Sequence, residues 1–100
     1  MKGKVVIITG ASSGIGMSCA IEFAKQGAKL MLAARSEKKL REISDKINSN
    51  GGNSSFIVTD VSIENDCKKM VQKTISIFGQ IDILINNAGI TGPTEPLWGV

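Results

Sequence analysis

The sequence contains no histidine and no tyrosine, and only two cysteines, two prolines and four aromatic residues in 100 positions. Without histidine, this stretch has no Ser-His or Cys-His pair for nucleophilic catalysis. Cys19 and Cys67 are too far apart in sequence for the CxxC spacing of metal and redox sites, so no metal site is predicted. Two lone thiols are typical of proteins from a reducing compartment.

Long apolar runs are also missing. No segment approaches the roughly 20 apolar residues that a membrane-spanning helix needs. Residues 1–4 carry two lysines, but the apolar stretch Val5–Ile8 that follows is too short for a secretory signal. The composition, with 42% hydrophobic and 21% charged residues, is typical of a globular domain and excludes a disordered tail. These features predict a cytoplasmic protein with no membrane partner.

The charge balance is mildly positive, +3 from 12 basic and 9 acidic residues, but the basic residues form no block. Lys38, Lys39 and Arg41, for example, alternate with Glu37 and Glu42. No aromatic residue lies among them to stack on bases. This pattern indicates solvent-exposed helix faces and no nucleic-acid partner.

Short apolar runs alternate with longer amphipathic segments along the whole chain. The apolar runs predict strands over residues 4–9, 29–34, 55–59 and 82–86. Helices are expected between them, the first over residues 14–26, the second after Ser36 as N-cap and the third after Ser62 as N-cap. This βαβαβαβ order predicts an α/β fold, a Rossmann-type doubly wound parallel sheet with helices on both faces.

The spacing of apolar residues predicts which side of each helix is buried. The expected apolar stripe of the first helix is Ile15, Cys19 and Phe23. For the second helix it is Leu40, Ile43 and Ile47. For the third helix it is Ile63, Cys67, Met70, Val71, Ile75 and Phe78, with Gly79 ending the helix.

The expected fourth strand carries Ile83, Leu84 and Ile85 in succession and is therefore apolar on both faces. Such a strand belongs inside a sheet, because an exposed apolar edge invites aggregation. Four strands and three helices are also only about half to two-thirds of a doubly wound nucleotide-binding sheet. We therefore expect residues 1–100 to be the N-terminal part of a single domain that is incomplete at Val100.

A glycine-rich loop connects the first expected strand to the first helix. Gly10 would make the turn off the strand, Gly14 would allow close approach of a ligand, and Gly16 would pack the helix tightly. Ser12 and Ser13 are candidates to cap the helix and to donate hydrogen bonds to a phosphate. A plain strand-to-helix turn is the alternative, but the position between a buried strand and a helix favours a phosphate site. The loop lacks the Gly-Lys-Ser/Thr of P-loop proteins.

The end of the second strand predicts which dinucleotide would bind. In this architecture that position lies beside the adenosine ribose, where an acid selects NAD. The chain instead has Arg35 and Ser36 after Ala34, with no acid before Glu37. A guanidinium and a hydroxyl suit the 2′-phosphate of NADP. NADP is therefore favoured over NAD, against the alternative that Arg35 is only a solvated residue at a strand end.

Three motifs together resemble the short-chain dehydrogenases/reductases. They are Thr9-Gly10-x-x-x-Gly14-x-Gly16, then Asp60-Val61 after the third strand, and Asn86-Asn87-Ala88-Gly89 after the fourth. The resemblance extends over essentially the whole chain, with the motifs in order. It implies an oxidoreductase that moves a hydride between a nicotinamide cofactor and a small carbonyl or alcohol substrate, and an intact enzyme that is a homo-oligomer.

The resemblance also implies a role for each motif residue. The residues at the pyrophosphate and neighbouring ribose would be Gly10, Ser12, Ser13, Gly14 and Ile15, with Gly16 supporting the loop. Arg35 with Ser36 would hold the 2′-phosphate. The adenine would lie on Asp60 and Val61, unless Asp60 only caps the next helix. The ribose-lining residues would be Asn87, Ala88 and Gly89, while Asn86 would tie the central strands together.

The catalytic residues of the resembled family are absent from this chain. Those enzymes use a Tyr-x-x-x-Lys pair with an upstream serine, and this sequence has no tyrosine. We therefore expect the cofactor part of an enzyme, truncated before its catalytic half, with no catalytic residue and no activity of its own. The alternatives are a naturally short, non-catalytic nucleotide-binding module and an S-adenosylmethionine methyltransferase. The missing acid after the second strand counts against the methyltransferase.

Overall fold

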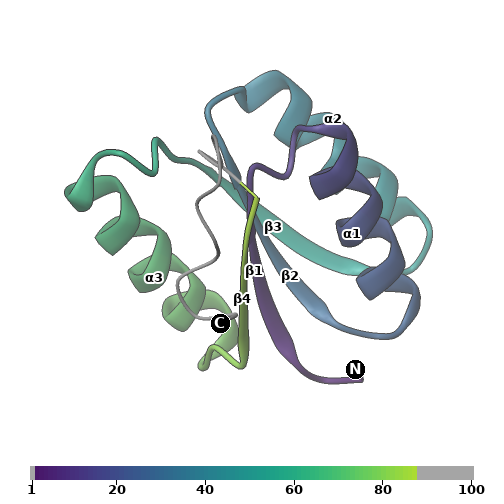
Figure 1. Ribbon diagram of the computed structural model, residues 1–100. Coiled ribbons are helices and arrows are strands. Elements are labelled where there is room, and N and C mark those ends of the chain that lie inside the picture. Colours follow the sequence, from purple (N-terminus) through teal and green to yellow (C-terminus); the bar gives the residue numbers. More distant parts are fainter. Residues whose placement is uncertain (1, 88–100) are drawn as a thin grey trace.

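The computed structural model describes residues 2–87, which form four strands and three helices in the predicted βαβαβαβ order (Figure 1). The elements are β1 (Val5–Thr9), α1 (Gly14–Lys25), β2 (Lys29–Ala34), α2 (Glu37–Ser49), β3 (Asn53–Val58), α3 (Glu64–Phe78) and β4 (Ile83–Asn86). The prediction of an α/β fold is therefore confirmed. Every element boundary lies within two residues of its expected position, as is usual where helix ends fray.

The four strands form one parallel sheet in the order β3-β2-β1-β4. The chain moves outward from β1 to β3 and then returns to place β4 on the other side of β1. In the central register, Ile7 of β1 lies opposite Met31 of β2 and Leu84 of β4. The carboxyl ends of all four strands therefore meet at one edge, with the change of direction between β1 and β4. This is a Rossmann-type arrangement.

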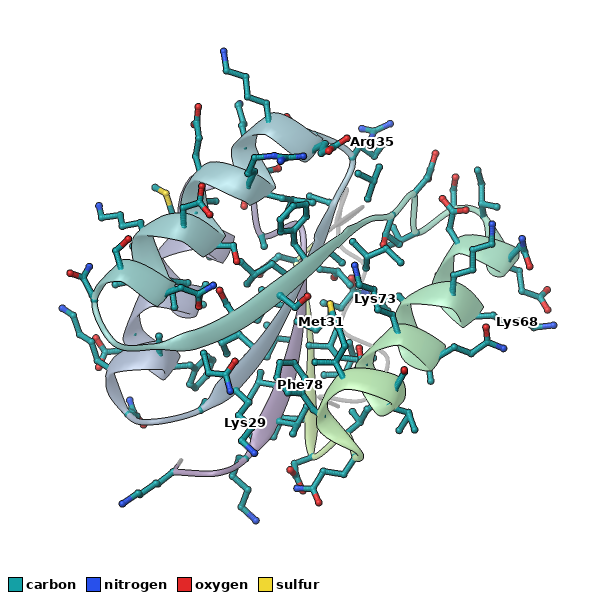
Figure 2. All side chains as sticks on the ribbon, turned by 180° about the vertical axis from the view of Figure 1, so that it is seen from behind. Lys29, Met31, Arg35, Lys68, Lys73 and Phe78 are labelled. Carbon is teal, nitrogen blue, oxygen red and sulfur yellow. The ribbon has the colours of Figure 1, made fainter. Side chains whose placement is uncertain are left out.

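The helices cover both faces of the sheet, α1 and α2 on one and α3 on the other (Figures 1 and 2). The two sides of β2 show how the core is divided. Leu30 and Leu32 pack into the cluster under α1 and α2, whereas Met31 packs into the smaller cluster under α3. All three side chains are fully buried. The continuously apolar sequence of β2 is thus explained by burial on both faces.

Helix α1 approaches the sheet through small residues. Gly16 and Ala20 are its buried residues, while Ile15 is 72% exposed. The predicted stripe is therefore wrong at Ile15, although Cys19 and Phe23 pack against the core as expected. The physical reason is that the first turn meets the loop backbone through Gly16, and the preceding position consequently faces solvent.

Helix α2 meets its prediction more closely. Ser36 is its N-cap, and Leu40, Ile43 and Ile47 are all buried. The helix ends at Ser49, and the chain then turns through Gly51 into β3.

Helix α3 differs from prediction at its start and along its buried side. The N-cap residue is Ile63, which makes no side-chain capping bond, so the prediction of Ser62 as the cap is wrong. Met70 and Thr74 are the buried residues of the helix, whereas Val71 and Ile75 are 41% and 46% exposed. Thr74 is tolerated inside because its Oγ1 donates to the Met70 carbonyl at 2.7 Å. A polar residue therefore takes a core position that hydrophobicity alone assigned to its neighbours.

None of the helices within residues 2–87 is long and apolar enough to cross a bilayer.

Candidate functional site

A cavity of about 600 Å³ opens at the carboxyl edge of the sheet. It is bounded by the segments that follow β1, β2, β3 and β4, which lie far apart in the sequence. Its lining residues are Gly10, Ser12, Ser13, Ala34, Arg35, Ser36, Lys39, Thr59, Asp60, Val61, Ser62 and Asn87. Crevices at this edge, where the strand order changes direction, are where open α/β sheets bind ligands.

The loop from β1 to α1 is held by Gly10 and Ser13. Gly10 has a φ of +66°, a conformation that glycine adopts without strain. Ser13 is the N-cap of α1: its Oγ accepts from the Gly16 N–H at 3.1 Å and donates to the Gly10 carbonyl at 2.8 Å. The single hydroxyl proton of Ser13 is therefore used in a hydrogen bond within the loop. Ser12 lines the cavity and makes no hydrogen bond to a residue within 2–87, which leaves its hydroxyl available to a ligand.

The other two glycines of the loop have opposite surroundings. A Cβ on Gly16 would lie 2.2 Å from the Gly10 carbonyl oxygen and 2.9 Å from the Ala11 Cα. A Cβ on Gly14 would meet nothing within 4 Å. Gly16 therefore permits the close contact of helix and loop, whereas Gly14 leaves an open space at the start of the helix. Such a space is what close approach of a ligand to the backbone requires.

The first turn of α1 presents unpaired donors. The amide N–H groups of Gly14 and Ile15 bond to no residue in the described part of the chain. No acidic side chain lies in this turn. Unpaired amides at the positive end of a helix dipole favour an anion. The side chain of Ile15 is exposed and does not line the cavity, so only its backbone is placed to contribute.

At the end of β2, Arg35 and Ser36 line the cavity together with Lys39. The Ser36 Oγ accepts from the Lys39 backbone N–H at 3.4 Å and so caps α2. Lys29 lies at the start of β2, and Arg35 lies just beyond the other end of the strand (Figure 2). Lys39 is exposed, as predicted for a solvent-facing helix residue, and its position in the first turn of α2 also brings it to the cavity. The sequence signal that could have found it is its place three residues after the helix cap.

Asp60 lies beyond the end of β3 and makes a local turn. Its Oδ1 accepts from the Ser62 Oγ at 2.6 Å and from the Ser62 backbone N–H at 3.0 Å. These bonds, with a smaller contribution from the positive charge of Arg35, hold the pKa of Asp60 below its usual value. Asp60 is not the side-chain cap of α3, since its carboxylate bonds to Ser62, which precedes that helix. Val61 lines the cavity beside it.

The ends of β1 and β4 are tied through Thr9. Its Oγ1 donates to the Asn86 Oδ1 at 2.8 Å and accepts from the Asn87 backbone N–H at 3.2 Å. The expectation that Asn86 ties the central strands is confirmed. The Asn87 Nδ2 is buried without a hydrogen-bond partner in the described part of the chain, although Asn87 lines the cavity. A buried amide donor without a partner is costly unless a ligand or water supplies one.

The remaining expectations concern metal ions and the last two motif residues. Ala88 and Gly89 lie outside the described residues. Within residues 2–87, no group of three or more histidine, cysteine, aspartate and glutamate side chains is placed to hold a metal ion.

Comparison with known families shows to which family this chain belongs. Residues 4–97 match the sequence model described as short chain dehydrogenase. The chain belongs to the short-chain dehydrogenase family. The resemblance inferred from the three motifs is therefore confirmed.

Known short-chain dehydrogenases and related oxidoreductases match over most of this chain. It is 53% identical to 11-beta-hydroxysteroid dehydrogenase A from Sesamum indicum over 89 residues, which is 88% of the chain and 26% of the relative. The solved hydroxysteroid dehydrogenase from Escherichia coli has a TM-score of 0.87 at 37% identity, covering 92% of this chain and 39% of that one. A metagenomic short-chain oxidoreductase in complex with NADP has a TM-score of 0.84 at 32% identity, covering 100% of this chain and 45% of that one.

The chain spans about a quarter to two-fifths of the length of the curated relatives. What it shares with short-chain dehydrogenases is the nucleotide-binding region, and the residues present fit a nicotinamide dinucleotide. The open space at Gly14 suits the approach of a pyrophosphate to the backbone. The Asn87 Nδ2, which has no hydrogen-bond partner among residues 2–87, is available to donate to a ribose or phosphate oxygen. The cavity is also large enough for a nucleotide, and it carries an arginine and a lysine.

Proposed function

We propose that this chain is the NADP(H)-binding part of an oxidoreductase that moves a hydride between NADP(H) and a small carbonyl or alcohol substrate. Residues 1–100 would form the N-terminal part of a single domain, and the remainder would carry the catalytic serine and the Tyr-x-x-x-Lys pair. The short share of the relatives' length that the chain spans supports this division. We further propose that the intact enzyme is a cytoplasmic homo-oligomer.

The observation that carries the choice of NADP is the end of β2. Arg35 lines the same cavity as the glycine loop, and none of the lining residues that follow β2 is acidic before Asp60. An acid at this place would bond to the ribose hydroxyls and repel a 2′-phosphate, whereas a guanidinium donates charge-assisted hydrogen bonds to it. The position therefore favours the phosphorylated cofactor.

The chain's own residues would bind and orient the cofactor. The α1 amides of Gly14 and Ile15, with the Ser12 hydroxyl, would bind the pyrophosphate. Asp60 and Val61 would flank the adenine, and Asn87 would bond to the ribose, together with Ala88 and Gly89 beyond the described residues. The nicotinamide, when bound, supplies or accepts the hydride. The proton of the reaction would come from a group outside this sequence, because the sequence lacks tyrosine and histidine.

The test of this function is the cofactor preference of the full-length protein that contains this chain. Arg35→Asp should lower the ratio of kcat/KM for NADPH to that for NADH by about 100-fold, because it replaces a charge-assisted contact with repulsion. Lys38→Asp is the control, since Lys38 lies in the same helical turn region but outside the cavity. An unchanged ratio in Arg35→Asp would contradict the assignment of Arg35.

The absence of tyrosine also fits a second candidate, a short nucleotide-binding module without catalysis. Sequencing the natural reading frame past codon 100 distinguishes the two. A serine followed by Tyr-x-x-x-Lys supports the oxidoreductase, whereas a stop codon supports the module. An S-adenosylmethionine-binding protein would instead be stabilised against heat by S-adenosylmethionine and not by NADPH.

A further inference from the structure

Two cations line the cavity at the end of β2 without an acidic partner. Arg35 directly follows the strand, and Lys39 lies in the first turn of α2. Neither forms a salt bridge with a residue in the described part of the chain. The one acidic side chain in the first turn of α2, Glu37, pairs with Arg41 one turn further along. The positive charge of Lys39 is therefore not neutralised by its own helix.

The location of Lys39 is electrostatically unfavourable in the absence of a ligand. The N-terminus of a helix carries the positive end of the dipole, which favours anions and disfavours a lysine. Here the dipole end of α2, Lys39 and Arg35 add to one another at a single wall of the cavity. A bound anion would be attracted by all three at once.

One carboxylate, Asp60, also lines this cavity. Its Oδ1 accepts from the Ser62 Oγ at 2.6 Å and from the Ser62 backbone N–H at 3.0 Å. Asp60 forms no salt bridge with Arg35 or Lys39 in the described part of the chain. Both cations are therefore available to pair with an anionic ligand.

We infer that Lys39 is a second determinant of nucleotide choice, which contacts the 2′-phosphate from the α2 side while Arg35 contacts it from the end of β2. The inference rests on the proposed function, because it assigns the phosphate monoester of that cofactor to the wall formed by these two residues. The inference predicts that the 2′-phosphate is bound by the planar guanidinium of Arg35 and by the ammonium of Lys39. The Ser36 hydroxyl, between these two residues in the sequence, would donate a hydrogen bond to the same phosphate.

The test compares Lys39→Gln with Lys38→Gln in the full-length protein. Both variants remove one positive charge from adjacent exposed positions of α2, but Lys38 lines a separate shallow surface with Glu42 and Asp45. The probes are adenosine 2′,5′-bisphosphate and adenosine 5′-monophosphate, measured by calorimetry, because they differ only in the 2′-phosphate. Lys39→Gln should weaken the bisphosphate about tenfold, the effect of losing one charged contact, and leave the monophosphate unchanged.

The control outcomes separate this inference from the proposed function. Lys38→Gln should change neither affinity, and Lys39→Arg should retain most of the preference. Equal loss of both probes in Lys39→Gln, or loss of neither, would overturn the role of Lys39 while leaving nucleotide binding intact. If the unchanged protein binds NADPH and NADH equally, both the NADP preference and the role of Lys39 fail. If it binds neither, the proposed function itself fails.

Discussion

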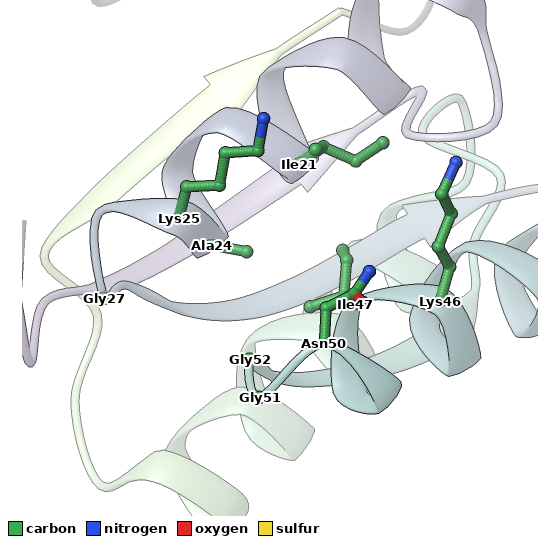
Figure 3. Close-up of a pocket in the computed structure, with 9 residues that line it drawn as sticks. All are labelled: Ile21, Ala24, Lys25, Gly27, Lys46, Ile47, Asn50, Gly51 and Gly52. Atoms are coloured by element: carbon green, nitrogen blue, oxygen red, sulfur yellow. The ribbon is translucent and has the colours of Figure 1, made fainter.

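The two ends of the sheet carry cavities of nearly equal size that lie at opposite ends of the helix dipoles. The cavity at the carboxyl end measures about 600 Å³, and one at the amino end, between α1 and α2, measures about 570 Å³. Both contain two cationic side chains. At the amino end these are Lys25 and Lys46, one on each helix (Figure 3).

The difference between the two ends lies in the direction of the helices. In a parallel sheet every crossover helix begins at the carboxyl edge and ends at the amino edge. Lys25 and Lys46 therefore lie in the last turns of α1 and α2, where their charges compensate the negative ends of the dipoles. Arg35 and Lys39 lie where the dipole adds to their charge. Because size and cation count are alike at the two ends, helix polarity is the property that favours the carboxyl end for an anion.

The largest difference between the two ends is expected from substitution of a closely packed glycine at each end. Gly16→Ala at the carboxyl end places a Cβ 2.2 Å from the backbone oxygen of Gly10. We expect it to destabilise the fold by about 3 kcal/mol, as overpacking against immobile backbone does, and to weaken NADPH binding at least tenfold. Gly52→Ala at the amino end places a Cβ 2.6 Å from the Ile47 Cγ2 and 2.9 Å from the Ile47 carbonyl oxygen. It should cost about 1–2 kcal/mol and leave NADPH affinity unchanged.

Urea unfolding and NADPH titration of both variants test this expectation. Gly14→Ala is the matched control, because its Cβ meets nothing within 4 Å. It should preserve or slightly raise stability, through better helix propensity, while weakening NADPH by occupying the open space. Equal NADPH affinities in the Gly14→Ala and Gly52→Ala proteins would show that the carboxyl-end cavity does not hold the nucleotide.

An intermediate effect is expected from two aspartates, one at each end. Asp82, at the amino end, accepts from the Val5 N–H at 2.8 Å and the Gln80 Nε2 at 2.7 Å, and these bonds hold its pKa below the usual value. A carboxyl whose pKa is lowered by folding stabilises the fold above the unfolded pKa, about 3.9, and loses this effect as the pH falls through the lower folded value. Asp82→Asn should therefore lower the melting temperature at pH 7 and flatten its decline below about pH 4.

Asp60→Asn is the carboxyl-end counterpart, because the pKa of Asp60 is also lowered, by its bonds to Ser62. It should show the same flattening with pH, and it should also change NADPH affinity, which Asp82→Asn should not. Melting curves from pH 2 to 7, with NADPH titrations at pH 7, measure both properties. If NADPH affinity shifts equally in the two variants, the assignment of Asp60 to the nucleotide is wrong.

The smallest effect is expected from the lysines of the amino-end cavity. The double variant Lys25→Gln/Lys46→Gln removes two positive charges, the same number that Arg35 and Lys39 carry at the other end. Lys25 and Lys46 lie in the last turns of α1 and α2, where the helix dipole favours a cation. The double variant should lose only about 1 kcal/mol of stability at low salt, through the weaker helix-dipole interaction. Its affinity for adenosine 2′,5′-bisphosphate should not change. A marked fall in that affinity would show that the amino-end cavity also binds the anion.

Most of the fold could be predicted from the sequence because its signals are local. The run of apolar residues in β2, the cap at Ser36 and the glycine at position 79 each act within a few residues of themselves. The prediction failed where two surfaces had to meet. Hydrophobicity assigned Ile15 to the buried side of α1, but Gly16 faces the loop because only a residue without Cβ fits against Gly10.

The candidate site divides in the same way. By itself, the sequence determined the glycine loop, the absence of an acid beside Arg35 and the absence of a catalytic tyrosine, since these depend on residue type and order. Only the tertiary structure decided that Lys39 joins Arg35, that Ser62 binds Asp60 instead of capping α3, and that the Asn87 Nδ2 is buried without a described partner. The reason is that parallel pairing brings together strand ends that are far apart in the sequence, such as Thr9 and Asn86, which are separated by 77 residues. No local pattern specifies which side chains then share one cavity.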